Sequence, residues 1–283
     1  MATGTLPGVR QSVPECAGVK NNRWEQAVSG PQHSEHWSAA GMPGYRRVLR
    51  VEPGEGAVFS LLEDDLHCMA VRLQHDGQRV LAVAPLMDRV PWTVCPGAAE
   101  VLVRTFTGAA LADVTARRDK QANCTHLHDL AVIGAAHALD KSPVEYRIFV
   151  SDPCEVDGAR ERRLEVLRDG APVHRWIERD GQFTGPAGLA GLTALTMRDW
   201  IAGLGREEQE AARLLQWASL VAHGRMMSDE QRRASLEKRP SCFTMQPGRV
   251  EQARMANGMH DFSAGGTEPL AGLHARFEAV HGA

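Results

Sequence analysis

The sequence predicts an α+β fold made of two antiparallel β meanders, each followed by helices, with an extended C-terminal tail. Short apolar segments bounded by turn signals recur in two blocks, residues 45–84 and 144–184. Helical apolar patterns follow each block as a group and do not alternate with single strands, which favours α+β over a wound parallel sheet. The last stretch, residues 238–283, has no sustained period and holds Phe243 and Phe262, which is typical of a chain that packs across another surface.

These patterns divide the chain into four parts. Residues 1–44 are rich in Gly, Pro and polar side chains, so we expect an extended arm. Residues 45–140 form a first strand-then-helix unit, and residues 144–237 form a second unit that packs on the first. Residues 238–283 are an irregular wrapping tail.

In the first unit, alternation and turn chemistry define the elements. Pro-Gly-Glu-Gly at 53–56 and His-Asp-Gly-Gln at 75–78 are turn signals between strands. The expected strands are residues 45–52, 57–62, 66–74 and 79–84, and the expected helices are residues 98–106, 111–118 and 124–139.

In the second unit, Arg-Asp-Gly at 168–170 and at 179–181 separates alternating segments. The expected strands are residues 144–151, 162–168, 171–178 and 182–184. Helices are expected at residues 193–203 and 207–223.

Composition excludes several classes of function. The net charge of -3 gives no basic footprint for nucleic acid and no polybasic patch for a membrane surface. No apolar run has the length of a membrane span, and the first residues lack the pattern of a secretory signal. We therefore expect a cytoplasmic protein that acts on a small molecule and forms a homo-oligomer, with a homodimer as the simplest case.

Residues 123–130 gather the densest set of reactive side chains. Cys124, His126, His128 and Asp129 lie at the start of a strongly apolar helix, and Asn123 suits its N-cap. A helix N-terminus carries partial positive charge, which favours a thiolate or a bound anion. This stretch is the expected centre of the chemistry.

One hypothesis for this centre is a metal site. Thiolate and imidazole are the ligands of zinc and related transition metals. The candidate ligands are His67, Cys95, Cys124 and His126. Their spacing does not fit a compact zinc finger, so tertiary structure would have to assemble the site.

A second hypothesis is nucleophilic catalysis by Cys124. A thiol with a depressed pKa, a histidine base from His67, His126 or His128, and Asp129 as orienting group would suit a thioester hydrolase.

A third hypothesis is acid/base chemistry without a metal or a thiol intermediate. Histidines and carboxylates in an apolar pocket transfer protons in lyases. Asp88 and Trp92 would then bind the substrate, the latter by stacking, and Arg249 could hold a carboxylate by its planar fork. Against all three stands the interpretation that the cysteines only pack the core.

Four segments in order resemble the bacterial DUF2889 family, whose function is unassigned. They are His67 with R-V-L-A-V-A at 79–84, P-W-T-V-C-P at 91–96, F-T-G at 106–108 and N-C-T-H-L-H-D-L at 123–130. The family pattern places a glycine where Asn123 stands. The resemblance covers about residues 45–139 and supports His67, Cys95, Cys124 and His126 as a set.

This resemblance implies a bacterial protein connected with catabolism of aromatic and acyl-CoA compounds. The function expected is therefore an enzyme, a lyase with acid/base or metal-assisted chemistry on an aromatic, lignin-derived type of substrate. A Cys124-dependent thioester hydrolase and a zinc-stabilised or ligand-binding accessory protein without catalysis are the alternatives.

Overall fold

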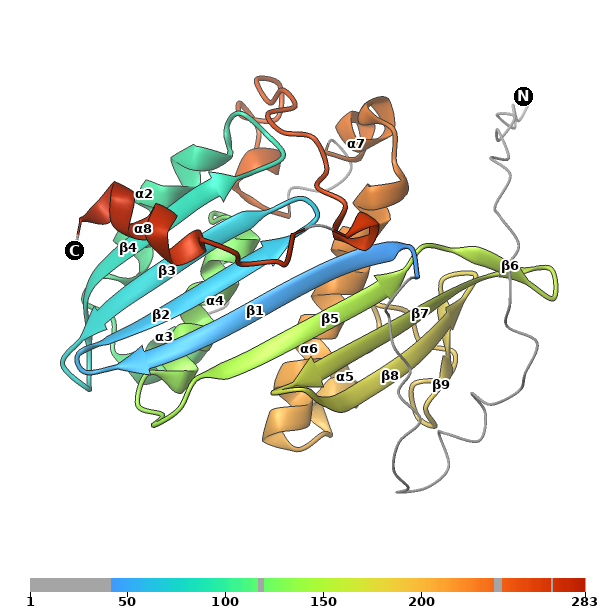
Figure 1. The fold of residues 1–283 in the computed structure, drawn as a ribbon, viewed down its shortest axis with the longest axis horizontal. Helices are drawn as coiled ribbons and strands as arrows, with labels where there is room; N and C mark the ends of the chain where they lie inside the picture. The colour runs from blue at the N-terminus through green and yellow to red at the C-terminus, as the bar shows by residue number, and fades with distance from the viewer. Residues whose placement is uncertain (1–41, 117–119, 237–240, 266, 283) are drawn as a thin grey trace.

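The computed structural model describes residues 42–116, 120–236, 241–265 and 267–282. It confirms the α+β class (Figure 1). The arm predicted for residues 1–44 lies outside the described residues except for its last three, and Gly44 already belongs to the first strand.

The two predicted meanders are not separate sheets. All strands belong to one antiparallel nine-stranded sheet in the order β4-β3-β2-β1-β5-β7-β8-β9, with β6 paired to β7. The two blocks join because β1 pairs with β5 along its length, from Gly44 opposite Ser151 to Val51 opposite Val144. The strands are β1 Gly44–Gly54, β2 Ala57–Asp64, β3 Cys68–His75, β4 Val80–Arg89, β5 Val144–Ser151, β6 Cys154–Val156, β7 Ala159–Arg168, β8 Ala171–Arg179 and β9 Gln182–Gly185.

Most helices cover one face of this sheet. Helix α4 packs on β1, β2 and β3, and α6 packs on β5, β7 and β8. The α-helices are α2 Ala98–Phe106, α3 Leu111–Ala116, α4 Thr125–His137, α5 Arg198–Ala202, α6 Arg206–Ala222, α7 Asp229–Leu236 and α8 Leu273–His281. The 3₁₀ turns are η1 Cys95–Gly97, η2 His223–Met226, η3 Phe243–Met245 and η4 Phe262–Ala264.

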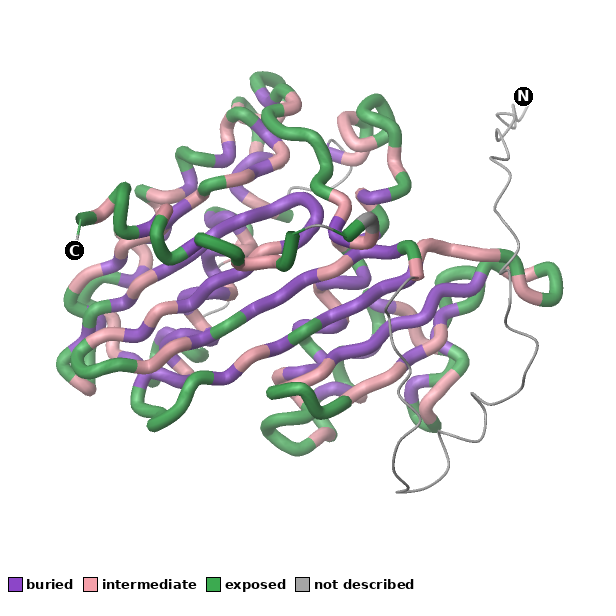
Figure 2. The backbone as a smooth tube through the Cα atoms, in the orientation of Figure 1, coloured by how far each residue is buried: buried purple, intermediate pink, exposed green. Residues whose placement is uncertain are grey.

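The core lies between the sheet and these helices. Buried positions concentrate along the central strands (Figure 2). Helix α4 comes close to the sheet at Gly134, where a Cβ atom would lie 2.6 Å from the Ser60 Oγ of β2. Leu127, Leu130 and Ala131 of the same helix are fully buried, as the apolar pattern of residues 124–139 predicted.

The start of α4 differs from the prediction. Cys124, with an extended backbone, is the N-cap residue, and Asn123 lies one position earlier. Asn123 is buried and its carbonyl accepts the backbone N–H of Phe243 (2.9 Å). The side chain of Asn123 donates to Thr105 Oγ1 (3.4 Å). Its polar groups therefore join α4 to α2 and to the tail.

The tail is less irregular than predicted, because it contains α8. Phe277 and Leu273 of α8 are fully buried against the sheet face opposite α4. Before α8 the chain passes the ends of β2 and β3, where the His260 N–H donates to the carbonyl of Asp65 (2.8 Å). Arg225 of η2 pairs with both Asp65 and Asp261, at 2.7 and 2.9 Å. The tail is thus fixed beside the turn that joins β2 to β3.

Four cysteines, Cys68, Cys95, Cys124 and Cys242, carry free thiols, and Cys154 is disulfide-bonded. The first three are buried. No helix in the described ranges combines the length and apolar character needed to cross a lipid bilayer.

Candidate functional site

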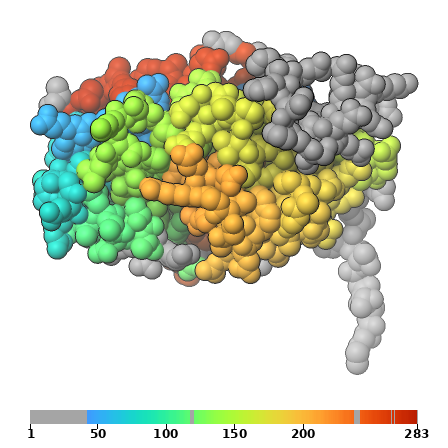
Figure 3. All heavy atoms as spheres, turned by 90° about the horizontal axis from the view of Figure 1, so that it is seen from below, coloured from blue at the N-terminus to red at the C-terminus, as the bar shows by residue number. Residues whose placement is uncertain are grey.

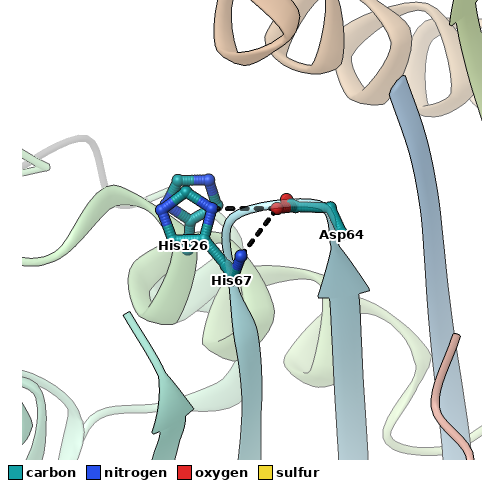
Figure 4. A group of neighbouring side chains, drawn as sticks. All are labelled: Asp64, His67 and His126. Carbon is teal, nitrogen blue, oxygen red and sulfur yellow. Dashed lines mark hydrogen bonds and ion pairs between the residues drawn. The ribbon is translucent and has the colours of Figure 1, made fainter. Parts of the chain in front are cut away.

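Two predicted site residues, His67 and His126, meet at one end of the sheet. His67 lies in the turn between β2 and β3, and His126 is the second residue of α4 (Figure 4). Asp64 ends β2, and the β1–β2 register places Arg47 directly opposite it. Because α4 packs on β1, β2 and β3, its N-terminus brings His126 to the same end of the strands.

Asp64 organises the turn that carries His67. Its Oδ1 atom accepts the backbone N–H groups of Leu66 and His67, both at 2.8 Å. The same oxygen lies 3.0 Å from Nδ1 of His67. A carboxylate that accepts backbone N–H groups two and three residues ahead closes a local turn. The turn therefore fixes both the backbone and the ring of His67.

The other carboxylate oxygen of Asp64, Oδ2, pairs with the positive charge of Arg47. Oδ2 accepts the hydroxyl of Tyr45 (2.6 Å) and the Nε and Nη2 groups of Arg47 (3.0 and 2.7 Å). Asp64 and Arg47 are both buried. Burial alone would raise the pKa of Asp64, but the neighbouring charges of His67 and Arg47 hold it well below its usual range. Asp64 is therefore an anion and acts only as an acceptor.

His126 is held as a neutral ring. Its Nε2 atom lies 3.1 Å from Nη2 of Arg47, and a guanidinium can only donate, so Nε2 is the acceptor and the proton is on Nδ1. Burial, followed by the charges of His67 and Arg47, lowers the pKa of His126 well below its ordinary value. The rings of His67 and His126 stack with centroids 3.8 Å apart. Two charged rings at this distance would repel each other, which also favours a neutral His126.

Asp64, His67 and His126 could hold a metal ion. Within the described ranges they are the one group of three or more His, Cys, Asp or Glu side chains whose ligand atoms all lie within 4.8 Å of one another. The group contains His67 and His126 of the predicted metal set. Cys95 and Cys124 are not part of it.

The cysteines form a separate environment. Cys95 Sγ lies 3.2 Å from Thr244 Oγ1 of the tail. Burial raises the pKa of the Cys124 thiol to about 12, and the nearby thiols of Cys95 and Cys242 act in the same direction. This is the opposite of the thiolate expected at a helix N-terminus, because desolvation outweighs the helix end.

His128 and Asp129 do not join the group. His128 is fully buried 5.2 Å from the ring of Phe106, and neither of its nitrogens has a hydrogen-bond partner among the described residues. Asp129 forms an ion pair with Lys120. The side chains of His126 and His128 therefore lie in different environments, although the two residues are only two positions apart.

The three predicted substrate-binding residues are also placed elsewhere. Asp88 pairs with Arg276 of α8 (3.0 Å). Trp92 is buried and forms an isolated bridge with Met255. The Arg249 guanidinium lies over the Phe243 ring, 3.8 Å from its centroid. None of them belongs to the Asp64–His67–His126 group, so their assignment to a substrate stays a prediction.

Sequence reasoning missed Asp64, Arg47 and Tyr45. A signal for Asp64 was present, since it ends an apolar segment three residues before His67. Arg47 and Tyr45 gave no such signal, because both lie within β1 and reach Asp64 only when β1 pairs with β2.

No known protein family matches the chain, and no curated protein matches it significantly. The resemblance to DUF2889 therefore stays a prediction.

Proposed function

We propose that this protein is a small-molecule enzyme of the lyase type with acid/base chemistry. His67 would take a proton from the substrate, and His126 would stabilise the negative charge that develops. The observation that carries the proposal is the Asp64–His67 hydrogen bond beside a neutral His126 that Arg47 holds. A carboxylate that orients one histidine, next to a second imidazole that a guanidinium holds in the neutral form, is a combination that proton-transfer enzymes use.

His67 takes the role of base. In the neutral ring, the form that can act as a base, Nδ1–H donates to Asp64 and the lone pair lies on Nε2. Nε2 has no hydrogen-bond partner in the described part of the chain and is not among the fully enclosed polar atoms. This nitrogen can accept a proton from a substrate carbon, and Asp64 stabilises the imidazolium that forms.

His126 takes the role of hydrogen-bond donor. With Nε2 occupied by Arg47, its Nδ1–H is the group left to polarise a substrate carbonyl. A neutral imidazole near a helix N-terminus suits this task, because it stabilises a developing oxyanion without giving up its proton beforehand. Together the two rings would remove a proton next to a carbonyl group and hold the resulting enolate, which is the first step of many lyase reactions.

The substrate class rests on the resemblance of residues 45–139 to DUF2889. It favours an aromatic compound of the lignin-derived type. The cytoplasmic location and the homo-oligomer are part of the same proposal and rest on composition alone.

A metal-assisted form is the second candidate, favoured by the clustering of Asp64, His67 and His126 within 4.8 Å. Both oxygens of Asp64 already accept three hydrogen bonds each, so His67 Nε2 is the readiest ligand atom for a cation such as Zn²⁺, and Asp64 and His126 would join it by giving up a present hydrogen bond. Asp64 would orient this ligand from behind. A bound cation would supply Lewis acidity, and the guanidinium of Arg47 beside His126 would oppose its charge.

Elemental analysis separates these forms. Stoichiometric metal that is lost in His67→Gln and His126→Gln but kept in Cys95→Ser and Cys124→Ser would support the metal-assisted form. A Cys95 and Cys124 site would show the reverse pattern.

Proton transfer itself is tested in D₂O with a panel of small aromatic carbonyl compounds and acyl thioesters, by following exchange of the C–H next to the carbonyl by NMR. We expect exchange with the wild-type protein and with Cys124→Ser, and its loss in His67→Gln. Exchange or thioester cleavage that survives in His67→Gln but is lost in Cys124→Ser would contradict the proposal and favour the hydrolase.

A further inference from the structure

A concave site lies between the two helical parts of the molecule. It is a groove of about 470 Å³ lined by α3 and α4 on one side and by α6 on the other, and we call it the α4–α6 groove. Figure 3 views the face on which the α3–α4 segment, in green, lies beside the start of α6, in orange. None of Asp64, His67 and His126 lines it.

The floor of the groove is apolar. Val132, Ala136 and Leu139 contribute from the side of α4, and Leu214 and Trp217 contribute from α6. Leu139 is 69% exposed, so a large apolar side chain stands at the rim in contact with water. A pocket of this size and lining is typical of small-molecule sites, in which a few polar groups fix the orientation of the ligand.

The acidic residues of the groove are already neutralised. Asp129 pairs with Lys120. Glu210 accepts the hydroxyl of Tyr146 (2.5 Å) and lies 2.8 Å from Nε2 of His137. The other nitrogen of His137 faces Asp140 at 2.6 Å. The hydrogen bond with Glu210 is the largest of the effects that raise the pKa of His137, so the contact favours the charged form of this ring beside Glu210.

The basic residues of the groove are not neutralised in this way. Arg206 and Arg213 are exposed, and neither has an acidic partner among the residues that the structure describes. Within the described part of the chain, Arg213 donates to the side-chain oxygen of Gln209 (3.2 Å) and to no other group. Lys120, already paired with Asp129, lies over the ring of Trp217 at 3.2 Å from the centroid. An apolar floor therefore lies beside two guanidinium groups that have no carboxylate partner among the described residues.

We propose that the α4–α6 groove binds a small amphipathic carboxylate. The alkyl or aryl part of the ligand packs on Val132, Ala136 and Trp217, and the carboxylate receives hydrogen bonds from Arg213 and Arg206. A guanidinium offers two parallel N–H groups to a carboxylate, which gives such a pair both strength and orientation. This site is separate from the acid/base group and does not depend on the proposed function.

Isothermal titration of the full-length protein with octanoate tests the assignment, with octan-1-ol as the uncharged ligand of equal chain length. We expect saturable binding of octanoate, and binding of the alcohol at least about tenfold weaker, because charge-assisted hydrogen bonds are lost. Arg213→Gln should weaken octanoate binding by a similar factor, and Arg206→Gln should weaken it less or equally. Arg198→Gln, on the exposed surface of α5 and outside the groove, is the matched control and should bind as the wild type does.

Val132→Trp fills the groove and should abolish binding, with circular dichroism to confirm folding. The assignment is overturned if octanoate does not bind, if the acid and the alcohol bind equally, or if Arg213→Gln and Arg198→Gln behave alike. His67→Gln should bind octanoate normally, so failure of the acid/base proposal and failure of this one are distinguishable.

Discussion

Replacing Asp64 by Asn tests whether the buried ion pair between Asp64 and Arg47 stabilises the fold. The substitution keeps the shape of the side chain but removes the negative charge opposite Arg47, whose side chain is only 2% exposed. Breaking a buried ion pair by removing one partner typically costs about 3–5 kcal/mol, because the remaining charge is buried without compensation. That is a fifth or more of the stability of an ordinary domain, at about 5–15 kcal/mol. It corresponds to a fall in Tm of about 6–20 °C for a chain of this size.

The assay is urea unfolding followed by tryptophan fluorescence, at several pH values. The folded-state pKa of Asp64 lies below its unfolded value of about 3.9, so its contribution is complete above that pH and is lost as the pH falls through the folded pKa. The difference between wild type and Asp64→Asn should therefore be constant near neutral pH and should shrink in acid.

The double variant Asp64→Asn with Arg47→Met removes both charges and should recover part of the loss, since no uncompensated charge remains. A loss below about 1 kcal/mol for Asp64→Asn alone would show that the pair is not buried as described, because exposed pairs contribute that little.

Three further predictions concern the surroundings of the site. Gly134→Ala should destabilise the protein by about 1–3 kcal/mol, because the new methyl group would lie 2.6 Å from Ser60 Oγ. Adding Ser60→Ala should restore the stability measured by urea unfolding. A double variant that is no more stable than Gly134→Ala would refute the contact. His137→Gln should cost more stability at pH 5.5 than at pH 9, because the raised folded pKa gives stability that is present below the unfolded value of about 6.5 and fades as the pH rises through the folded value. An equal cost at both pH values contradicts a charged ring. Cys124 should react with iodoacetamide at least about tenfold more slowly in the native protein than in urea, as followed by mass spectrometry, since a buried thiol with a pKa near 12 forms little thiolate. Rapid labelling of Cys124 in the folded protein would contradict this expectation and would favour Cys124 as a nucleophile.

The strands and main helices were accessible from the sequence because their signals are local. The predicted turn signals at 53–56 and 75–78 overlap the turns that join β1 to β2 and β3 to β4. Helix α2 spans Ala98–Phe106 as predicted. The joining of the two blocks into one sheet was not accessible, because it depends on pairing β1 with β5 over about a hundred residues of intervening chain. Helix α8 was missed because its buried side is small, with Leu273 and Phe277 as its buried residues.

The site was accessible only in part for a related reason. His67 and His126 were recognised as chemistry-bearing residues, but Asp64 and Arg47 gain their role from strand register. The behaviour of Cys124 depends on competition between a helix end and burial, and only the structure shows that burial is larger. The direction of His126 depended on α4 beginning at Thr125, which placed its ring toward Arg47.

The most direct test of the central claim is a long-range ¹H–¹⁵N correlation spectrum of ¹⁵N-histidine-labelled protein at pH 6, assigned with His67→Asn and His126→Asn. We expect His126 to be neutral, with its proton on Nδ1 and no proton on Nε2, and we expect His67 to carry a proton on the Nδ1 that faces Asp64. A His126 ring that is protonated on Nε2 at this pH would contradict the Arg47 contact and with it the division of roles between the two histidines.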